Sequence, residues 1–305
     1  MNRRKGNELP MSRVSREERK QAALADRPRT TAADTVIYVI LTVMSFIWLV
    51  PIAWLVLTSF RGEPGAWTPY IFPKEYTFDN YIKLFTETQL FNYPRWFMNT
   101  LIVAIFTCVI STILVLLTSY TLSRLRFKAR TGIMNVGLIL GMFPGFMSMI
   151  AVYFILKAMG LSQSLIALVL VYSGGAGLGY YIAKGFFDTI PKVLDEAAIV
   201  DGASQNTIFW RIILPMSRPI IIYTVLVSFM APWVDFIFVS VIMKDNYNNY
   251  TIALGLYQML TRENIYKYFT QFCAGAVLIA IPITLLFIFM QRYYVEGVTG
   301  GAVKG

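Results

Sequence analysis

Six long runs with little or no charge constrain this chain more than any other feature of its sequence. They cover residues 36–60, 96–123, 131–156, 160–183, 219–243 and 268–291, and within them only Asp235 is charged. About 20 apolar residues are enough for a helix to cross the hydrocarbon core of a membrane. The runs lack the period-two alternation of barrel strands. The sequence therefore predicts an all-α polytopic membrane protein with six transmembrane helices.

The scarce residue types narrow the chemistry that this chain can perform. Only 14% of its residues are charged, whereas a soluble protein has about 25%. The chain has no histidine, which excludes histidine bases, histidine metal ligands and histidine-containing triads. Cys108 and Cys273 both fall inside apolar runs. We expect small apolar core residues at both positions, and neither a disulfide framework nor a cysteine metal site.

The Lys and Arg residues between the apolar runs predict how the chain is threaded through the membrane. With the amino terminus in the cytoplasm, 19 of these residues lie on the cytoplasmic side and 8 on the outer side. Cytoplasmic loops carry such an excess. Both termini and the segment 184–218 are therefore expected in the cytoplasm. The net charge of +10 is explained by this topology without a nucleic-acid partner.

A polar stretch at residues 195–215 interrupts the apolar runs and predicts a helix, a turn and a second helix. The residues before Gly202 favour helix, and Gly202 can take the left-handed conformation that ends one. Ser204 is a suitable N-cap for the second helix. Pro215 should end that helix at or before Leu214.

This stretch resembles the EAA loop of the permease subunits of ATP-driven importers. The resemblance implies a type I ABC importer permease whose short EAA helix lies in a groove on a cytoplasmic ATPase, with two alanines keeping the helix slim. On spacing alone, an ordinary cytoplasmic loop between spans remains the alternative. The signature positions, expected to couple the chain to the ATPase, are Glu196, Ala197, Ala198, Gly202, Ile212, Leu214 and Pro215.

Further segments resemble the second permease subunit of maltose- and maltodextrin-type importers. They are residues 142–144, 151–153, 250–256, 291–293 and 299–305. The resemblance implies a maltose, maltodextrin or other oligosaccharide substrate, with a different sugar or a polyol as the alternative. It also implies a homologous permease, two ATPase subunits and an extracytoplasmic sugar-binding protein as partners, in the cytoplasmic membrane of a prokaryote. The mechanism would be alternating access without covalent chemistry in this chain.

The energy for such transport has to come from the partner subunits. No G-x-x-x-x-G-K-[ST] loop occurs in the chain, so it has no recognisable phosphate cradle. The resemblance accordingly implies that ATP–Mg binds the ATPases and that this chain needs no cofactor or metal of its own.

Composition and the resemblance together suggest how the chain is divided. Residues 1–34 form a basic cytoplasmic tail with too little apolar surface to fold alone. Residues 35–60 form the first transmembrane helix, and residues 96–291 form a permease core of five. Residues 292–305 are expected to be a cytoplasmic carboxyl tail, of which residues 297–305 are short and flexible.

Four residues inside the runs are candidates for the substrate path. Tyr153, Tyr172 and Trp233 have rings that can stack on sugars, although most aromatic residues in membranes pack or anchor. Asp235 is an intramembrane charge, and such charges are functional candidates by default. The structural alternative is a carboxylate that is hydrogen-bonded to a neighbouring helix. Gly175 and Gly179 are spaced for a close helix-packing face.

The outer loop at residues 247–269 has a polar centre that we expect to dock the sugar-binding protein. A plain connector is the alternative. The residues of this centre are Leu260, Thr261, Arg262, Glu263 and Asn264.

Two other functional classes are considered. A membrane-embedded enzyme would need converging carboxylates or a metal site, and the runs contain a single carboxylate, Asp235. The second class is a passive channel or a proton-coupled carrier. Such carriers usually show chains of ionisable residues or broken repeat halves, and neither is visible in the sequence. ATP-dependent, vanadate-sensitive uptake separates the importer from both.

Overall fold

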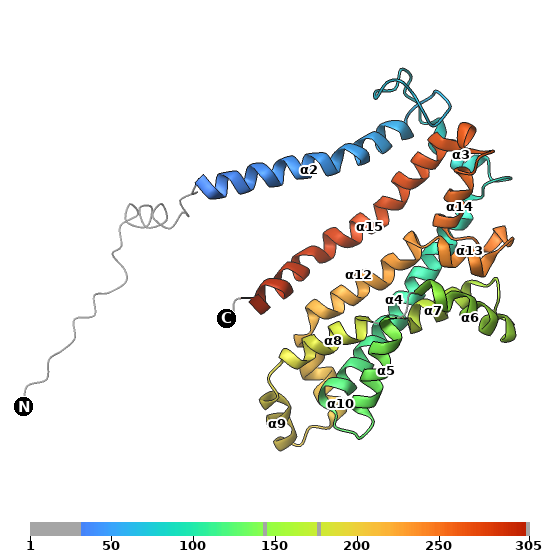
Figure 1. Cartoon of the computed structure of the whole chain (residues 1–305). Helices are drawn as coiled ribbons and strands as arrows, with labels where there is room; N and C mark the ends of the chain where they lie inside the picture. The colour runs from blue at the N-terminus through green and yellow to red at the C-terminus, as the bar shows by residue number, and fades with distance from the viewer. Residues whose placement is uncertain (1–31, 143–144, 176–177, 303–305) are drawn as a thin grey trace, which may run out of the picture. The chain divides into compact units, whose positions relative to one another are not determined.

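The computed structural model describes residues 32–142, 145–175 and 178–302, and these residues are almost entirely helical (Figure 1). Most of the expected tail, residues 1–31, lies outside the described residues. Residues 1–53 and 54–305 form two separate compact units. Helix α2 (Ala32–Ser59) supplies the described part of the first unit and continues into the second. It begins within the expected tail and carries Pro51 inside it.

The second unit contains all the other helices that the structure describes. They are α3 (Asp79–Thr86), α4 (Tyr93–Arg124), α5 (Arg130–Met142), α6 (Gly145–Ala158), α7 (Leu165–Gly174), α8 (Leu178–Thr189), α9 (Val193–Val200), α10 (Gln205–Ile208), the π-helix η1 (Phe209–Ile213), α11 (Leu214–Met216), α12 (Arg218–Val234), α13 (Ile237–Met243), the 3₁₀-helix η2 (Tyr247–Asn249), α14 (Ile252–Met259) and α15 (Ile265–Ala302).

The predicted spans are only partly continuous helices. Among the described residues, three helices are each long and apolar enough to cross a membrane, in α2, α4 and α15. Three bent pairs, α5 with α6, α7 with α8 and the α10–α11 segment with α12, raise the number to six if each pair is one span. The pairs bend by 108°, 41° and 81° respectively. The all-α membrane architecture is as predicted, with three continuous candidate spans and three bent helix pairs.

The expected run 219–243 is also interrupted. It is divided into α12 and α13, and the break falls at Asp235 and Phe236. Pro232 lies inside α12 and removes a backbone donor three residues before the break.

Helix α4 is the centre of the second unit and packs against α7, α8 and α12. Helices α3 and α14 lie at one end of this unit, and α9 and α10 lie at the other (Figure 1). At the α14 end, a Cβ on Gly255 would lie 2.1 Å from Trp96, so only glycine lets α14 approach α4 this closely. At the α9 end, a second apolar cluster gathers around Tyr120, Phe187 and Phe209.

Two expectations about local structure are wrong. Helix α15 continues to Ala302, so residues 297–302, which were expected to be flexible, are helical. No proline interrupts them, while residues 303–305 lie outside the described part. Gly175 does not serve a packing face, because a Cβ there would meet only Val171, in its own helix. It instead caps the carboxyl end of α7.

Candidate functional site

The segment around α9 has the helix–turn–helix geometry that its sequence predicts. Gly202 has a φ of +81°, in the left-handed region. The amide of Ala203 donates to the Ala198 carbonyl at 2.9 Å, and the amide of Gly202 donates to the Ile199 carbonyl at 3.0 Å. This pair of bonds is a Schellman motif, which satisfies the last carbonyls of a helix. Ser204 then caps α10 by accepting from the Thr207 amide at 3.2 Å.

The predicted stop at Pro215 is wrong. The chain stays helical through η1 and α11, and the turn comes at Ser217. The amide of Leu214 donates to the Phe209 carbonyl, which is the i→i+5 spacing of a π-helix. Because α11 starts a new hydrogen-bond register at Leu214, Pro215 falls in its first turn. Proline is tolerated there, since that position needs no helical donor.

The signature residues of this loop point in two directions. Glu196 and Ala197 are exposed, whereas Ala198 is only 8% exposed and packs into the cluster around Phe187. Ile212 and Leu214 are partly buried against the same cluster, and Pro215 is exposed. Of the two alanines that keep α9 slim, only Ala197 is exposed, and Ala198 is buried. It lies on the inner side of α9 and lets this helix approach its own body.

A cavity of about 390 Å³ lies between α4, α7, α8 and α12, and of the residues that line it only Tyr172 was predicted from the sequence to belong to the substrate path. Among the residues that the structure describes, no charged side chain lines it. The signal was available, because hydroxyl residues recur at helical i, i+4 spacing on α4 and on α12. Thr107 Oγ1 is buried and has no hydrogen-bond partner among the described residues. The hydroxyl residues of the lining are Thr107, Ser111, Tyr172, Tyr223, Thr224 and Ser228.

The structure brings together two of the four predicted path residues. The Tyr172 hydroxyl donates to Asp235 Oδ2 at 3.0 Å, and the Phe238 amide donates to Asp235 Oδ1 at 3.0 Å. Asp235 thereby links α7 to the start of α13, as the structural alternative for this residue anticipated. Trp233 is only 2% exposed in the core, and Tyr153 lies elsewhere with Lys244 Nζ 4.3 Å from its ring centre.

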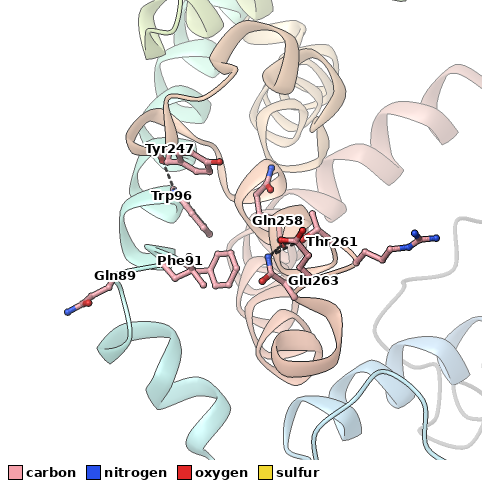
Figure 2. A pocket seen from close by; sticks show the side chains of 10 residues that line it. Gln89, Phe91, Trp96, Tyr247, Gln258, Thr261 and Glu263 are labelled. Carbon is pink, nitrogen blue, oxygen red and sulfur yellow. Dashed lines mark hydrogen bonds between the residues drawn. The ribbon is translucent and has the colours of Figure 1, made fainter.

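A larger cavity of about 700 Å³ opens at the α14 end (Figure 2). Thr261, Arg262, Glu263 and Asn264 contribute to its lining, but Leu260 does not. Figure 2 shows Phe91 and Trp96 on one side of it, and Gln258, Thr261 and Glu263 on the other. Asn264 Nδ2 donates to Thr261 Oγ1 and to the Gln258 carbonyl, both at 2.9 Å, which fixes the shape of the loop.

A second loop at the same end, residues 61–74, is held in shape by hydrogen bonds from its own side chains. The buried Arg61 guanidinium donates to the carbonyls of Glu63 and Gly65. The Lys74 amide donates to Glu63 Oε1 at 2.9 Å. Burial raises the pKa of Glu63, but hydrogen bonds from backbone amides and from a tyrosine hydroxyl lower it by more, so its pKa lies below the ordinary value. The Gly65 amide joins this loop to the Tyr266 carbonyl at 2.8 Å.

Over the ranges that the structure describes, His, Cys, Asp and Glu form no group of three or more that could hold a metal ion.

Comparisons with known proteins agree on the class of this chain. A family model described as "Binding-protein-dependent transport system inner membrane component" matches residues 115–300. The chain is 36% identical over 269 residues to the galactooligosaccharides transport system permease protein GanQ of Bacillus subtilis (strain 168), covering 88% of this chain and 94% of GanQ. It is 34% identical over 279 residues to the maltodextrin transport system permease protein MalD of Streptococcus pneumoniae (strain ATCC BAA-255 / R6), covering 91% and 97%.

A solved structure supports the fold. The chain matches a crystal structure of a bacterial ABC transporter involved in the import of the acidic polysaccharide alginate with a TM-score of 0.71. The match has 20% sequence identity and covers 88% of this chain and 99% of the other.

Proposed function

The chain belongs to the family of binding-protein-dependent transport system inner membrane components, and from this premise we propose that it forms one half of the path of an oligosaccharide importer. It is a permease subunit of an ABC transporter and is not itself catalytic. A second, homologous permease forms the other half of the path. Two cytoplasmic ATPases bind ATP–Mg and supply the energy, and both termini of this chain lie in the cytoplasm.

The hydroxyl-lined cavity is the observation that carries the proposal for the path. A sugar hydroxyl both donates and accepts hydrogen bonds, and so do the hydroxyls of Ser, Thr and Tyr. The absence of charge in the lining fits a neutral sugar better than an ion. Tyr172 belongs to the lining and also holds Asp235, so both remain in the proposed path. The names of the relatives favour a maltodextrin or a galactooligosaccharide as substrate.

Uptake measurements with the assembled transporter in proteoliposomes test this path. Uptake of labelled maltodextrins and galactooligosaccharides should require ATP and be blocked by vanadate. Thr107→Val removes a buried hydroxyl without changing the side-chain volume appreciably. One lost hydrogen bond is worth about 1 kcal/mol, so the initial uptake rate should fall about five-fold.

Thr121→Val is the matched control for this substitution. Thr121 also lies on α4, but its hydroxyl donates to the Leu117 carbonyl and it does not line the cavity. Equal uptake by the Thr107→Val variant and the control would remove this cavity from the path. ATP-independent uptake would overturn the importer proposal itself.

The exposed face of α9 is the proposed contact with an ATPase. Glu196 and Ala197 are exposed there, and so are the apolar Val193, Ile199 and Val200. Apolar side chains on a short helix outside the membrane runs are readily explained by a partner surface. The inner residues Ala198, Ile212 and Leu214 act in this scheme by shaping the loop.

The loop at residues 260–264 is the proposed docking site of the sugar-binding protein. It borders the cavity of about 700 Å³, and Asn264 holds it in a defined shape. With the binding protein present, a cysteine at Thr261 should crosslink to it only in assembled transporter. A plain connector would give no crosslink at Thr261 while cysteines elsewhere on the same end react.

A further inference from the structure

We propose that Arg124 is a positioning residue that transmits the movement of α9 to the long helix α4. The inference rests on the proposed function, in which an ATPase moves α9. The link between the α9 loop and the substrate path along α4 then consists of one ion pair, Arg124 with Asp195, and of two contacts of the same guanidinium with backbone carbonyls.

Arg124 is the last residue of α4, and its side chain is only 3% exposed. Its Nη2 donates to the Phe187 carbonyl at 2.9 Å and to the Ile190 carbonyl at 2.8 Å, at the end of α8 and in the turn that follows. Its Nη1 lies 3.2 Å from Asp195 Oδ2 on α9, whose side chain is 16% exposed. One guanidinium therefore touches three helical elements or their ends, α4, α8 and α9.

Helix α9 has few other attachments to the body. Ala198 is its only buried residue, and the side chain of alanine offers a single methyl group for packing. Removing one partner of a buried ion pair is strongly destabilising, because the other charge is left unpaired. The ion pair therefore fixes where α9 lies against α4 more firmly than the apolar contact does.

The pair also has unused hydrogen-bonding capacity. Nε and Nη1 of Arg124 and Oδ1 of Asp195 are buried and have no hydrogen-bond partner in the described part of the chain. Although Nη1 and Oδ2 are in ionic contact, they do not reach hydrogen-bond geometry. A planar guanidinium can meet a carboxylate at two points. The pair can thus tighten without separating when α9 shifts, which keeps α4 and α9 coupled through the movement.

The apolar surroundings favour joint movement of the same elements. Tyr120, one turn before Arg124 on α4, packs against Phe187 of α8 and Phe209 of η1, with ring centres 6.3 and 4.8 Å apart. Its hydroxyl also lies 3.2 Å from Gln205 Oε1 on α10. The segments on both sides of α9 are therefore anchored to α4, and Arg124 extends this anchoring to α9 itself.

The test measures coupling separately from assembly, with the complete transporter in proteoliposomes. Asp195→Asn removes the charge with little change of shape and leaves the exposed face of α9 intact. We expect the ATPase to be retained in a pull-down, while the ATP hydrolysed per sugar imported rises at least about five-fold, the lower end of typical coupling free energies. Arg124→Lys should uncouple as well, because lysine keeps the charge but lacks the fork that reaches both carbonyls. Asp195→Glu, which restores the charge, should recover most of the coupling.

Lys184→Gln is the matched control. It removes an ion pair of the same kind, with Lys184 Nζ 2.6 Å from Asp188 Oδ2, but both residues lie on α8. Its ratio of ATP to sugar should equal that of the unmodified protein. If assembled Asp195→Asn transporter keeps the normal ratio, or if Asp195→Glu behaves like Asp195→Asn, the inference is wrong while the importer function stands. If the unmodified transporter shows no ATP-dependent sugar uptake, the proposed function fails first.

Discussion

At the α14 end of the second unit, side chains of α4 form buried or partly buried hydrogen bonds with the backbone of residues 248–252. Asn99 Nδ2 donates to the carbonyls of Asn248 and Tyr250 at 2.8 and 3.0 Å, and Thr100 Oγ1 accepts from the Ile252 amide at 2.7 Å. At the α9 end, the exposed helix α9 buries Ala198 alone. One end is thus held by many shared bonds, while at the other a helix is held by few.

The difference indicates which end can move without unfolding. Segments with few buried contacts open at low cost, whereas densely bonded segments open only with the whole fold. Helix α9 can therefore change position under force from a partner. The α14 end stays fixed and presents a rigid rim around its cavity. Substitutions at the two ends should accordingly have different consequences, stability at one and coupling at the other.

The largest effect is expected from Trp96→Ala at the rigid end. Trp96 is buried, its Nε1 donates to the Tyr247 carbonyl at 3.0 Å, and Gly255 packs directly against its ring. Replacing a buried tryptophan by alanine costs about 3–5 kcal/mol. Thermal unfolding of the detergent-solubilised protein should show a much lower midpoint. Trp67→Ala is the control, because Trp67 is 94% exposed; equal midpoints for the two variants would contradict the rigid-end interpretation.

A smaller effect, on partner binding instead of stability, is expected from Gly202 at the mobile end. A Cβ at Gly202 meets nothing within 4 Å, so only the left-handed backbone opposes a side chain there. That strain is about 1 kcal/mol or more for alanine and less for asparagine. Gly202→Asp adds a charge that contact with an ATPase would desolvate. For Gly202→Asp, the amount of ATPase recovered in a pull-down should therefore fall at least about ten-fold, which corresponds to about 1.4 kcal/mol.

The comparison among the three Gly202 variants sharpens this test. Gly202→Asn should be mild, because asparagine tolerates the left-handed region and brings no charge, and Gly202→Ala should be intermediate. All three variants should insert and pair with the second permease. Normal ATPase retention and transport by Gly202→Asp would mean that α9 is not the coupling element.

Asp235 lies at the break between α12 and α13, and its substitution should have a moderate effect on transport. Asp235→Asn weakens the bond from Tyr172, and Asp235→Leu removes both side-chain bonds that join α7 to α13. One hydrogen bond to a charged group contributes about 1.5–3 kcal/mol. Uptake should be reduced by Asp235→Asn and reduced further by Asp235→Leu, with membrane insertion unchanged. Tyr172→Phe should resemble Asp235→Asn. Full uptake by Asp235→Leu would mean that Asp235 has no role in transport.

What could be predicted from the sequence follows from how local each cause is. The turn at Gly202 was predictable because glycine and the Ser204 cap act within a few residues of themselves. The passage of helix through Pro215 was not, because it depends on a π-helix whose register is set by packing of Phe209 and Ile213 into the cluster at the α9 end. The direction of Ala198 likewise depends on what lies beneath α9.

The candidate path shows the same division. The apolar runs predicted membrane helices, but they could not show that hydroxyls of α4 and α12 face one cavity. Thr107 and Ser111, like Thr224 and Ser228, are spaced to lie on one helix face. Only the packing of the two helices shows that these faces meet.

The smallest effect is expected from acid at the rigid end, in the loop that Glu63 holds. Because hydrogen bonds outweigh burial and leave the pKa of Glu63 below its ordinary value, its contribution is fully present above that ordinary value, about 4.3. The contribution is lost as the pH falls through the lowered pKa of the folded state. Hydrogen exchange at the Lys74 amide, corrected for its intrinsic pH dependence, should therefore be constant from about pH 7 to 5 and rise below about pH 4.

Glu63→Ala should exchange rapidly at every pH, while Glu75→Ala, in the same loop, should follow the unmodified protein. A rise that begins near pH 6 would indicate that another group holds the loop, and an unchanged rate in Glu63→Ala would show that the Arg61 contacts alone keep this end rigid.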